Sequence, residues 1–95
     1  MARQTSFQHQ LELADNLKKY LHGFQERLGA AAQHYKNECN QIGEAGMMDE
    51  VFEDFTQNYM EATIQKIADL IEQINECDIP FVEKYIEYLE SNPSA

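Results

Sequence analysis

Apolar residues recur at helical spacing along almost the whole chain, and the pattern is interrupted once, by Gly-Glu-Ala-Gly at residues 43–46. A recurrence with a period of about 3.6 residues predicts an amphipathic helix on each side of this break. Because glycine favours turns and interrupts helices, we predict helices over residues 7–42 and 47–77, joined by a turn at 43–46. The fold class is therefore all-α, an antiparallel hairpin of two long helices in which Gly43 and Gly46 form the turn.

The helix ends carry residues that suit their positions. Thr5 or Ser6 can cap the first helix by accepting a hydrogen bond from an early backbone N–H. Carboxylates at positions 49, 50, 53 and 54 fall in the first two turns of the second helix, where they complement its dipole. Asp78 suits an N-cap and Pro80 a first turn, so we predict a short third helix over residues 80–90. A kink in one continuous helix is the alternative, and the last residues are predicted to fray.

Length and composition indicate one domain that covers residues 1–95. Hydrophobic residues make up 43% and charged residues 25% of the chain, as in ordinary folded proteins. We expect no membrane span, because no run approaches the roughly 20 apolar residues that a span needs. The first residues lack the apolar core of a cleaved signal peptide, so we expect a cytoplasmic protein or one exported without such a peptide.

The net charge of −10 is concentrated in the second half of the chain. Residues 1–42 sum to +1, with five Lys/Arg and four Asp/Glu, whereas residues 43–95 sum to −11, with two Lys and thirteen Asp/Glu. Phosphate binding needs clustered cations, so we expect no nucleic-acid partner. The acidic half either keeps the protein in solution or attracts a basic partner.

The first helix carries an apolar stripe that is wider than a simple coiled-coil seam. Its small-residue segment, Gly29-Ala-Ala-Ala32, would leave room for a large side chain from the second helix or allow another helix to approach closely. We favour the first of these interpretations. The candidates for an interface with a partner are the central members of the stripe, Leu17, Leu21, Phe24, Leu28, Ala31 and Tyr35.

The second helix is predicted to pack through one apolar face, flanked by Met48, Val51, Met60 and Ile64. The residues assigned to the face are Phe52, Phe55, Tyr59, Ala62, Ile67, Leu70, Ile71 and Ile74.

The two cysteines are predicted to remain unpaired. A helix over residues 7–42 is about 54 Å long, so Cys39 would lie near the turn and Cys77 near the opposite end of the hairpin. A disulfide needs Cα atoms within about 7 Å of one another. We expect both cysteines to be small core residues.

No set of residues in the sequence indicates catalysis, a metal ion or a cofactor. His9, His22 and His34 are not spaced as the i, i+4 pair of a helical zinc site, and the Glu-x-x-His signature of di-iron bundles is absent. Gly43-x-x-Gly46 is too short for a phosphate-binding loop and follows a predicted helix rather than a strand. We therefore expect no catalytic, metal-binding or cofactor-binding residues, and a protein that is not an enzyme.

The hairpin with a glycine turn resembles the small WXG-type proteins of type VII secretion. Gly46 stands at the glycine of the family's Trp-x-Gly motif, and Phe52 at its downstream aromatic residue. Glu44 occupies the position of the tryptophan, Met48 replaces the small residue, and the C-terminal Tyr-x-x-x-Asp/Glu export signal is missing. The resemblance implies a secreted small protein, or a partner that targets a secreted effector and uses that effector's export signal.

Interaction with another protein is thus the expected function. The apolar stripe is wider than one neighbouring helix covers, so we predict a homodimer, or a heterodimer with another helical protein, packed as a four-helix bundle. The alternative to the secretion-associated role is a cytosolic acidic adaptor, small chaperone or toxin-neutralising protein, for which the acidic half would face a basic partner.

Overall fold

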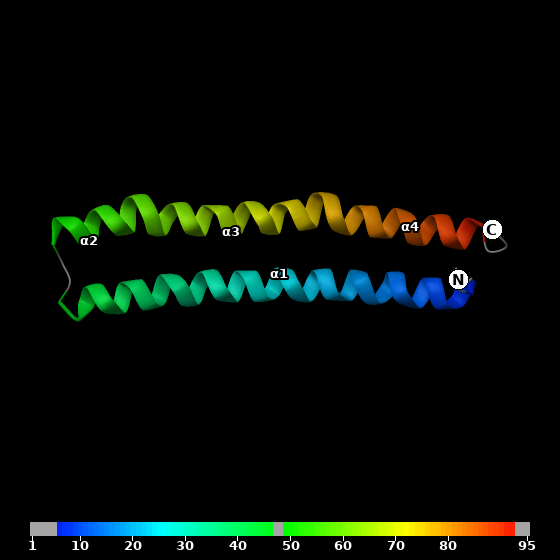
Figure 1. The fold of residues 1–95 in the computed structure, drawn as a ribbon, viewed down its shortest axis with the longest axis horizontal. Coiled ribbons are helices and arrows are strands. Elements are labelled where there is room, and N and C mark those ends of the chain that lie inside the picture. Colours follow the sequence, from blue (N-terminus) through cyan, green and yellow to red (C-terminus); the bar gives the residue numbers. More distant parts are fainter. Residues whose placement is uncertain (1–5, 47–48, 93–95) are drawn as a thin grey trace, which may run out of the picture. The chain divides into compact units, whose positions relative to one another are not determined.

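The computed structural model describes residues 6–46 and 49–92, and every regular element in these two ranges is helical (Figure 1). The first helix is α1, Phe7–Glu44. A second helical run follows, in which each element begins at the residue after the previous one ends. Its elements are α2 (Glu50–Asp54), the π-helical turn η1 (Phe55–Met60), α3 (Glu61–Gln73), the π-helical turn η2 (Ile74–Asp78) and α4 (Ile79–Ser91). The all-α class is confirmed.

Ser6, one of the two residues predicted to cap the first helix, is the N-cap of α1. The backbone N–H of His9 donates to Ser6 Oγ at 3.1 Å, and the N–H of Gln10 donates to the Ser6 carbonyl at 2.9 Å. The side chain thereby satisfies one early N–H group that lacks a helical partner, and the Ser6 carbonyl accepts the first hydrogen bond of the helix. The other candidate, Thr5, lies outside the described residues.

The turn after α1 depends on Gly46 rather than on Gly43. α1 extends two residues beyond the prediction, so Gly43 is a buried member of its last turn, and the Gly43 carbonyl also accepts a hydrogen bond from the Gly46 N–H at 3.1 Å. The N–H of Ala45 still donates to the Gln41 carbonyl at 2.9 Å, which keeps the backbone helical past Gly43. Gly46 has a φ of 127°, a conformation that side-chain-bearing residues rarely adopt. The change of direction therefore occurs where glycine is required.

Asp49 defines the start of the second helical run. Its backbone is extended, with φ −110° and ψ 176°, and its Oδ1 accepts a hydrogen bond from the N–H of Phe52 at 2.9 Å. The predicted starting residues, Met47 and Met48, lie outside the described residues. Glu50 and Glu53 occupy the first turn of α2, where their charges complement the helix dipole as predicted.

The predicted break at Asp78 and Pro80 is absent, because the helical backbone continues from η2 into α4. Asp78 has helical backbone angles and its side chain makes no cap hydrogen bond, so its assignment as an N-cap was wrong. In η2 the N–H of Ile79 donates to the Ile74 carbonyl, five residues earlier. Proline removes one helical hydrogen bond and crowds the carbonyl four residues before it. The wider turn accommodates Pro80 without ending the helix, so the alternative of one continuous helix describes this segment.

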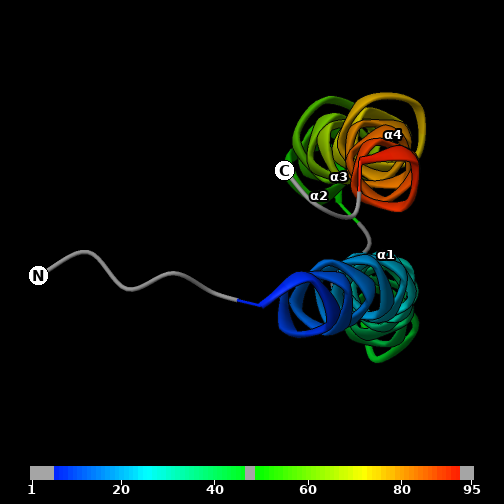
Figure 2. The ribbon, with the colours of Figure 1, turned by 90° about the vertical axis from the view of Figure 1, so that its right-hand side faces the viewer.

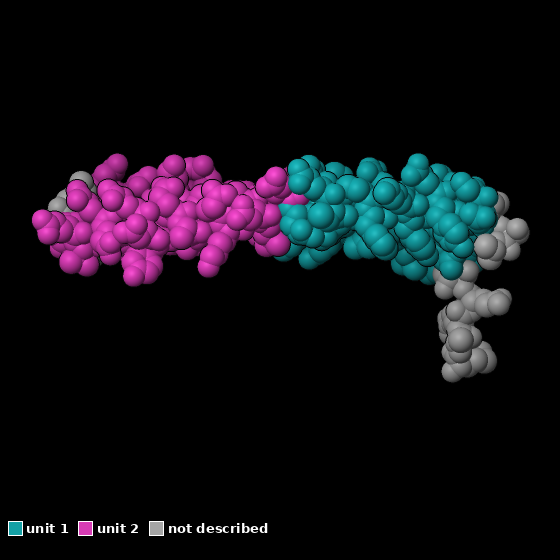
Figure 3. All heavy atoms as spheres, turned by 90° about the horizontal axis from the view of Figure 1, so that it is seen from above, with its two compact units in different colours: residues 1–25, 73–95 teal, residues 26–72 magenta. Residues whose placement is uncertain are grey.

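The described helices form two compact units (Figure 3). The terminal unit comprises Met1–Gln25 and Gln73–Ala95, and the turn unit comprises Glu26–Glu72. Within each unit, a part of α1 lies beside a part of the second helical run, in a single layer of helices (Figure 2). The buried apolar side chains are Ala14, Ile74, Ile79, Val82 and Leu89 in the terminal unit, and Cys39 and Met60 in the turn unit.

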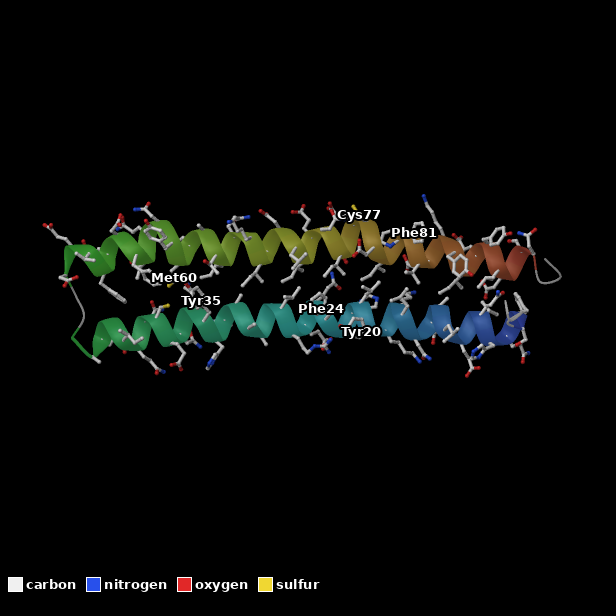
Figure 4. All side chains as sticks on the ribbon, in the orientation of Figure 1. Tyr20, Phe24, Tyr35, Met60, Cys77 and Phe81 are labelled. Carbon is white, nitrogen blue, oxygen red and sulfur yellow. The ribbon has the colours of Figure 1, made fainter. Side chains whose placement is uncertain are left out.

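The π-helical turns change which side chains are buried. Met60, predicted on the flank, is 4% exposed, whereas Tyr59, predicted on the packed face, is 61% exposed. Cys77 is exposed, so its assignment to the core was wrong, while Cys39 is buried as predicted. Figure 4 shows Met60 directed toward α1 and Cys77 directed away from it. Both cysteine thiols are free.

Candidate functional site

Large apolar side chains are exposed on both units. They are Leu13, Leu17, Tyr20, Phe81, Tyr85 and Tyr88 on the terminal unit, and Ile42, Val51, Tyr59 and Leu70 on the turn unit. Single exposed apolar residues are common, but contiguous groups mark surfaces that bind other molecules. The grooves that these residues line are therefore the candidate functional sites.

The first groove lies between α1 and α4 in the terminal unit and is called here the terminal groove. Leu13 and Leu17 form one wall and Phe81 and Tyr85 the other, and each pair is separated by one helical turn. Phe81 is 72% exposed, the largest fraction among these four residues. The lining of the terminal groove, which has a volume of about 360 Å³, is Gln10, Leu13, Ala14, Leu17, Phe81, Val82 and Tyr85.

No charged side chain lines the terminal groove in the described part of the chain. Ala14 and Val82, both 4% exposed, form its floor. A neighbouring hollow continues it past Leu17 and Phe81 to Leu21, where the thiol-bearing Cys77 and the carboxylate-bearing Asp78 also contribute. The lining of the terminal groove is therefore uncharged, and the first charged group, Asp78, lies in the neighbouring hollow.

An ion pair connects α1 and α4 beside this groove. Lys18 Nζ lies 2.9 Å from Glu83 Oε2, with 33% and 49% of the two side chains exposed. Lys19 Nζ also lies 3.1 Å from Asp15 Oδ2 within α1. Exposed pairs of this kind contribute about 0–1 kcal/mol each. The Lys18–Glu83 pair thus favours one register of the two helices, while the buried apolar residues supply most of their stability.

The second groove lies where α1 approaches α2 in the turn unit and is called here the turn groove. Two of its apolar side chains are open to solvent, since Val51 is 78% exposed and Ile42 is 48% exposed. Phe52 and Phe55 stack with ring centroids 6.1 Å apart, and Phe55 stacks on Tyr59 at 6.2 Å. The lining of the turn groove, which has a volume of about 510 Å³, is Cys39, Ile42, Asp49, Val51, Phe52 and Phe55.

The six predicted interface residues divide between the two units. Leu17 lines the terminal groove and Leu21 its continuation. Phe24 is half-buried, and its ring stacks with Tyr20 at a centroid distance of 6.0 Å (Figure 4). In the turn unit, Leu28 and Tyr35 are half-buried and Ala31 is exposed, and none of these three lines the turn groove. Two of the six candidates, Leu17 and Leu21, therefore line a hollow together with residues of α4.

The helix predicted over residues 80–90 contains Phe81 and Tyr85, but sequence reasoning did not select them for the interface. A usable signal was present, since these residues share the i, i+4 spacing of Leu13 and Leu17. Val51, the most exposed apolar residue of the turn groove, was expected on the flank of the packed face and was not selected for the interface, although it shares the i, i+4 spacing with Phe55.

The small-residue segment is not filled by the second helix at Gly29. A Cβ atom built on Gly29 would meet nothing within 4 Å, apart from the glycine's own helical surroundings. The favoured interpretation, that this glycine makes room for a large side chain, was therefore wrong. The first helix tolerates Gly29 without any packing requirement for it.

The described residues contain no group of three His, Cys, Asp or Glu side chains placed to hold a metal ion. The three histidines are all exposed on α1, at positions 9, 22 and 34. Over residues 6–46 and 49–92, no helix is both long enough and apolar enough to cross a membrane. The two grooves therefore remain the candidate functional sites on the described residues.

Comparison with known proteins adds no assignment. No protein-family model, curated protein or solved structure matches this chain. Any functional conclusion rests on the two grooves and on the distribution of charge.

Proposed function

We propose that this protein is a non-enzymatic interaction module that assembles through the terminal groove, with a second copy of the chain as the occupant. The observation that carries the proposal is the groove itself, with Leu13 and Leu17 facing solvent on one wall and Phe81 and Tyr85 on the other. Two walls with i, i+4 apolar residues form a channel that suits the ridge of another helix. Two copies packed in this way form a four-helix bundle.

Charge supports a second copy at this surface. The terminal unit contains four Lys/Arg and seven Asp/Glu, a net charge of −3, and none of these charged residues lines the groove. Two copies can therefore meet there without placing carboxylates against one another. A self-complementary surface of this type is the usual basis of symmetric dimers. A heterodimer with another helical protein through the same groove would be a different result of the experiment below.

The secretion-associated role is a narrower proposal. The glycine turn at Gly46, with an aromatic residue at Phe52 in the first turn of α2, supports a WXG-type small protein that is exported or that targets a secreted effector. A cytosolic acidic adaptor, chaperone or toxin neutraliser is the alternative, which the net charge of −10 favours. Co-expression with a type VII secretion system separates the two, because export of the chain supports the first and retention under conditions of active secretion supports the second.

The assembly is tested by sedimentation with two matched substitutions. Leu17 lines the terminal groove and is 48% exposed, whereas Leu70 lies in the turn unit, lines neither groove and is 43% exposed. Leu17→Asn and Leu70→Asn remove the same side chain from a helix and lose similar helix propensity. We expect the wild type and Leu70→Asn to be dimers at micromolar concentration. The dimer dissociation constant of Leu17→Asn should be at least about tenfold higher than that of the wild type. A wild type that stays monomeric, or equal effects of the two substitutions, would overturn the proposal.

A further inference from the structure

We propose that the turn groove binds a basic amphipathic helix of another protein, with apolar residues on one face and lysine or arginine on its borders. This inference extends the proposed helix-binding function to a second surface and assigns a charge to its occupant. It begins from the apolar part of the groove. Val51, Ile42 and the stacked Phe52 and Phe55 form a surface on which the apolar ridge of a helix can pack.

The charge around this groove differs from that around the terminal groove. The turn unit contains ten Asp/Glu and three Lys/Arg, a net charge of −7. Four of its carboxylates fall within the six residues from Asp49 to Asp54, all of them are exposed, and Asp49 itself lines the groove. Among the described residues, no ion pair with a Lys, Arg or His side chain neutralises these four. Asp49 Oδ1 accepts a hydrogen bond from the Phe52 N–H and Asp54 Oδ1 one from Asn58 Nδ2, but these carboxylates have no cationic partner in the described part of the chain. An approaching cation would therefore meet exposed carboxylates without a counter-ion.

The helix end beside the groove adds to this negative potential. Ile42 lies in the last turn of α1, where the helix dipole places partial negative charge, and no basic residue occupies that turn. The dipole at the start of α2 is already complemented by Asp49, Glu50 and Glu53. Lysine or arginine at the edge of a docked helix is thus favoured at this site, and glutamate or aspartate is disfavoured.

The same charges oppose a second copy of this chain as the occupant. Two turn units facing one another would bring two charges of −7 together around an apolar surface, which costs free energy at ordinary ionic strength. The terminal groove, with its uncharged lining, has no such cost. The two grooves therefore select different occupants, although both suit a helix.

The binding experiment uses the full chain and three synthetic helical peptides. The probe peptide carries leucine on one face and lysine on the other. One control peptide replaces every lysine by glutamate, and a second keeps the lysine composition but scrambles the order so that no apolar face remains. We expect the probe to bind and both controls to bind at least about tenfold more weakly, with probe affinity falling as salt is raised.

Substitutions then locate the site. We expect Val51→Asn to weaken probe binding at least about tenfold, because it places a polar group in the middle of the apolar contact. Asp49→Asn retains the cap oxygen and removes only the charge, so a loss of about two- to fivefold is expected. The matched controls, Leu70→Asn and Asp69→Asn, alter the same residue types outside the groove, and we expect changes of less than about twofold.

The possible outcomes are separable from those of the proposed function. Leu17→Asn should alter self-association and leave probe binding unchanged, so failure at one groove does not imply failure at the other. Absence of probe binding, equal binding of the glutamate or scrambled peptide, or equal effects of Val51→Asn and Leu70→Asn would overturn the inference. Dissociation of a wild-type dimer by Val51→Asn would also overturn it, because a second copy would then occupy the turn groove.

Discussion

Adding one methyl group to either of two glycines should change stability in opposite directions. Gly29 and Gly46 are matched in one respect, since a Cβ atom at either position would meet nothing within 4 Å. They differ in backbone conformation, because Gly29 lies in the interior of α1 and Gly46 has a φ of 127°. Any difference between Gly29→Ala and Gly46→Ala must therefore arise from the backbone and not from a steric clash.

The magnitudes follow from this difference. Glycine in a helix interior is about 0.8–1 kcal/mol less favourable than alanine, so Gly29→Ala should raise the free energy of unfolding by up to about that amount. An L-residue with a left-handed backbone costs roughly 1–3 kcal/mol, so Gly46→Ala should lower the free energy of unfolding by about 1 kcal/mol or more. The two variants should differ from one another by about 2–4 kcal/mol in the free energy of unfolding.

Urea denaturation followed by far-ultraviolet circular dichroism measures both effects. All variants are compared at one protein concentration, because association with a second copy would stabilise the folded form. The change in midpoint is interpreted at constant denaturant slope, which shows that the amount of surface exposed on unfolding is unchanged. Equal effects of the two substitutions, or stabilisation by Gly46→Ala, would show that the reversal of the chain does not depend on Gly46.

Three further predictions concern individual contacts. Asp49→Ala should destabilise the fold by about 1 kcal/mol in thermal unfolding and Asp49→Asn by much less, because only asparagine retains a cap acceptor; equal losses would contradict the cap. Iodoacetamide should modify exposed Cys77 faster than buried Cys39, as followed by mass spectrometry, and the reverse order would contradict the packing around the two thiols. A double-mutant cycle on Lys18 and Glu83 should give a coupling of at most about 1 kcal/mol that falls in high salt; a larger, salt-independent coupling would mean that the pair is desolvated.

Features that depend on neighbouring residues were predictable from the sequence. The cap at Ser6 follows from its hydroxyl at a helix start, and the reversal near Gly46 follows from the conformational freedom of glycine. Both require knowledge of only a few adjacent residues. The long helix before the turn follows in the same way from the spacing of its apolar residues.

The directions of side chains that follow a π-helical turn were not predictable from the sequence. A π-helical turn holds about one residue more per turn than an α-helix, so the side chains after it point in directions that a constant period does not give. This explains why Met60 is buried while Tyr59 is exposed, and why Cys77 is exposed rather than buried. Pro80 was read as a break because proline usually interrupts hydrogen bonding, whereas η2 accommodates it. The terminal groove depends on the pairing of α1 with α4, which no single-segment pattern specifies.

The most direct test of the central claim is a photo-cross-link from the terminal groove. Phe81, which is 72% exposed, is replaced by a benzophenone amino acid in a mixture of isotopically heavy and light copies of the chain, and Leu70 is replaced in the same way as the control. Assembly through the terminal groove predicts heavy–light cross-links from position 81 that mass spectrometry locates in the groove segments of the second copy, residues 10–17 or 81–85. Cross-links from position 81 that stay within one copy, or heavy–light yields as high from position 70, would contradict it.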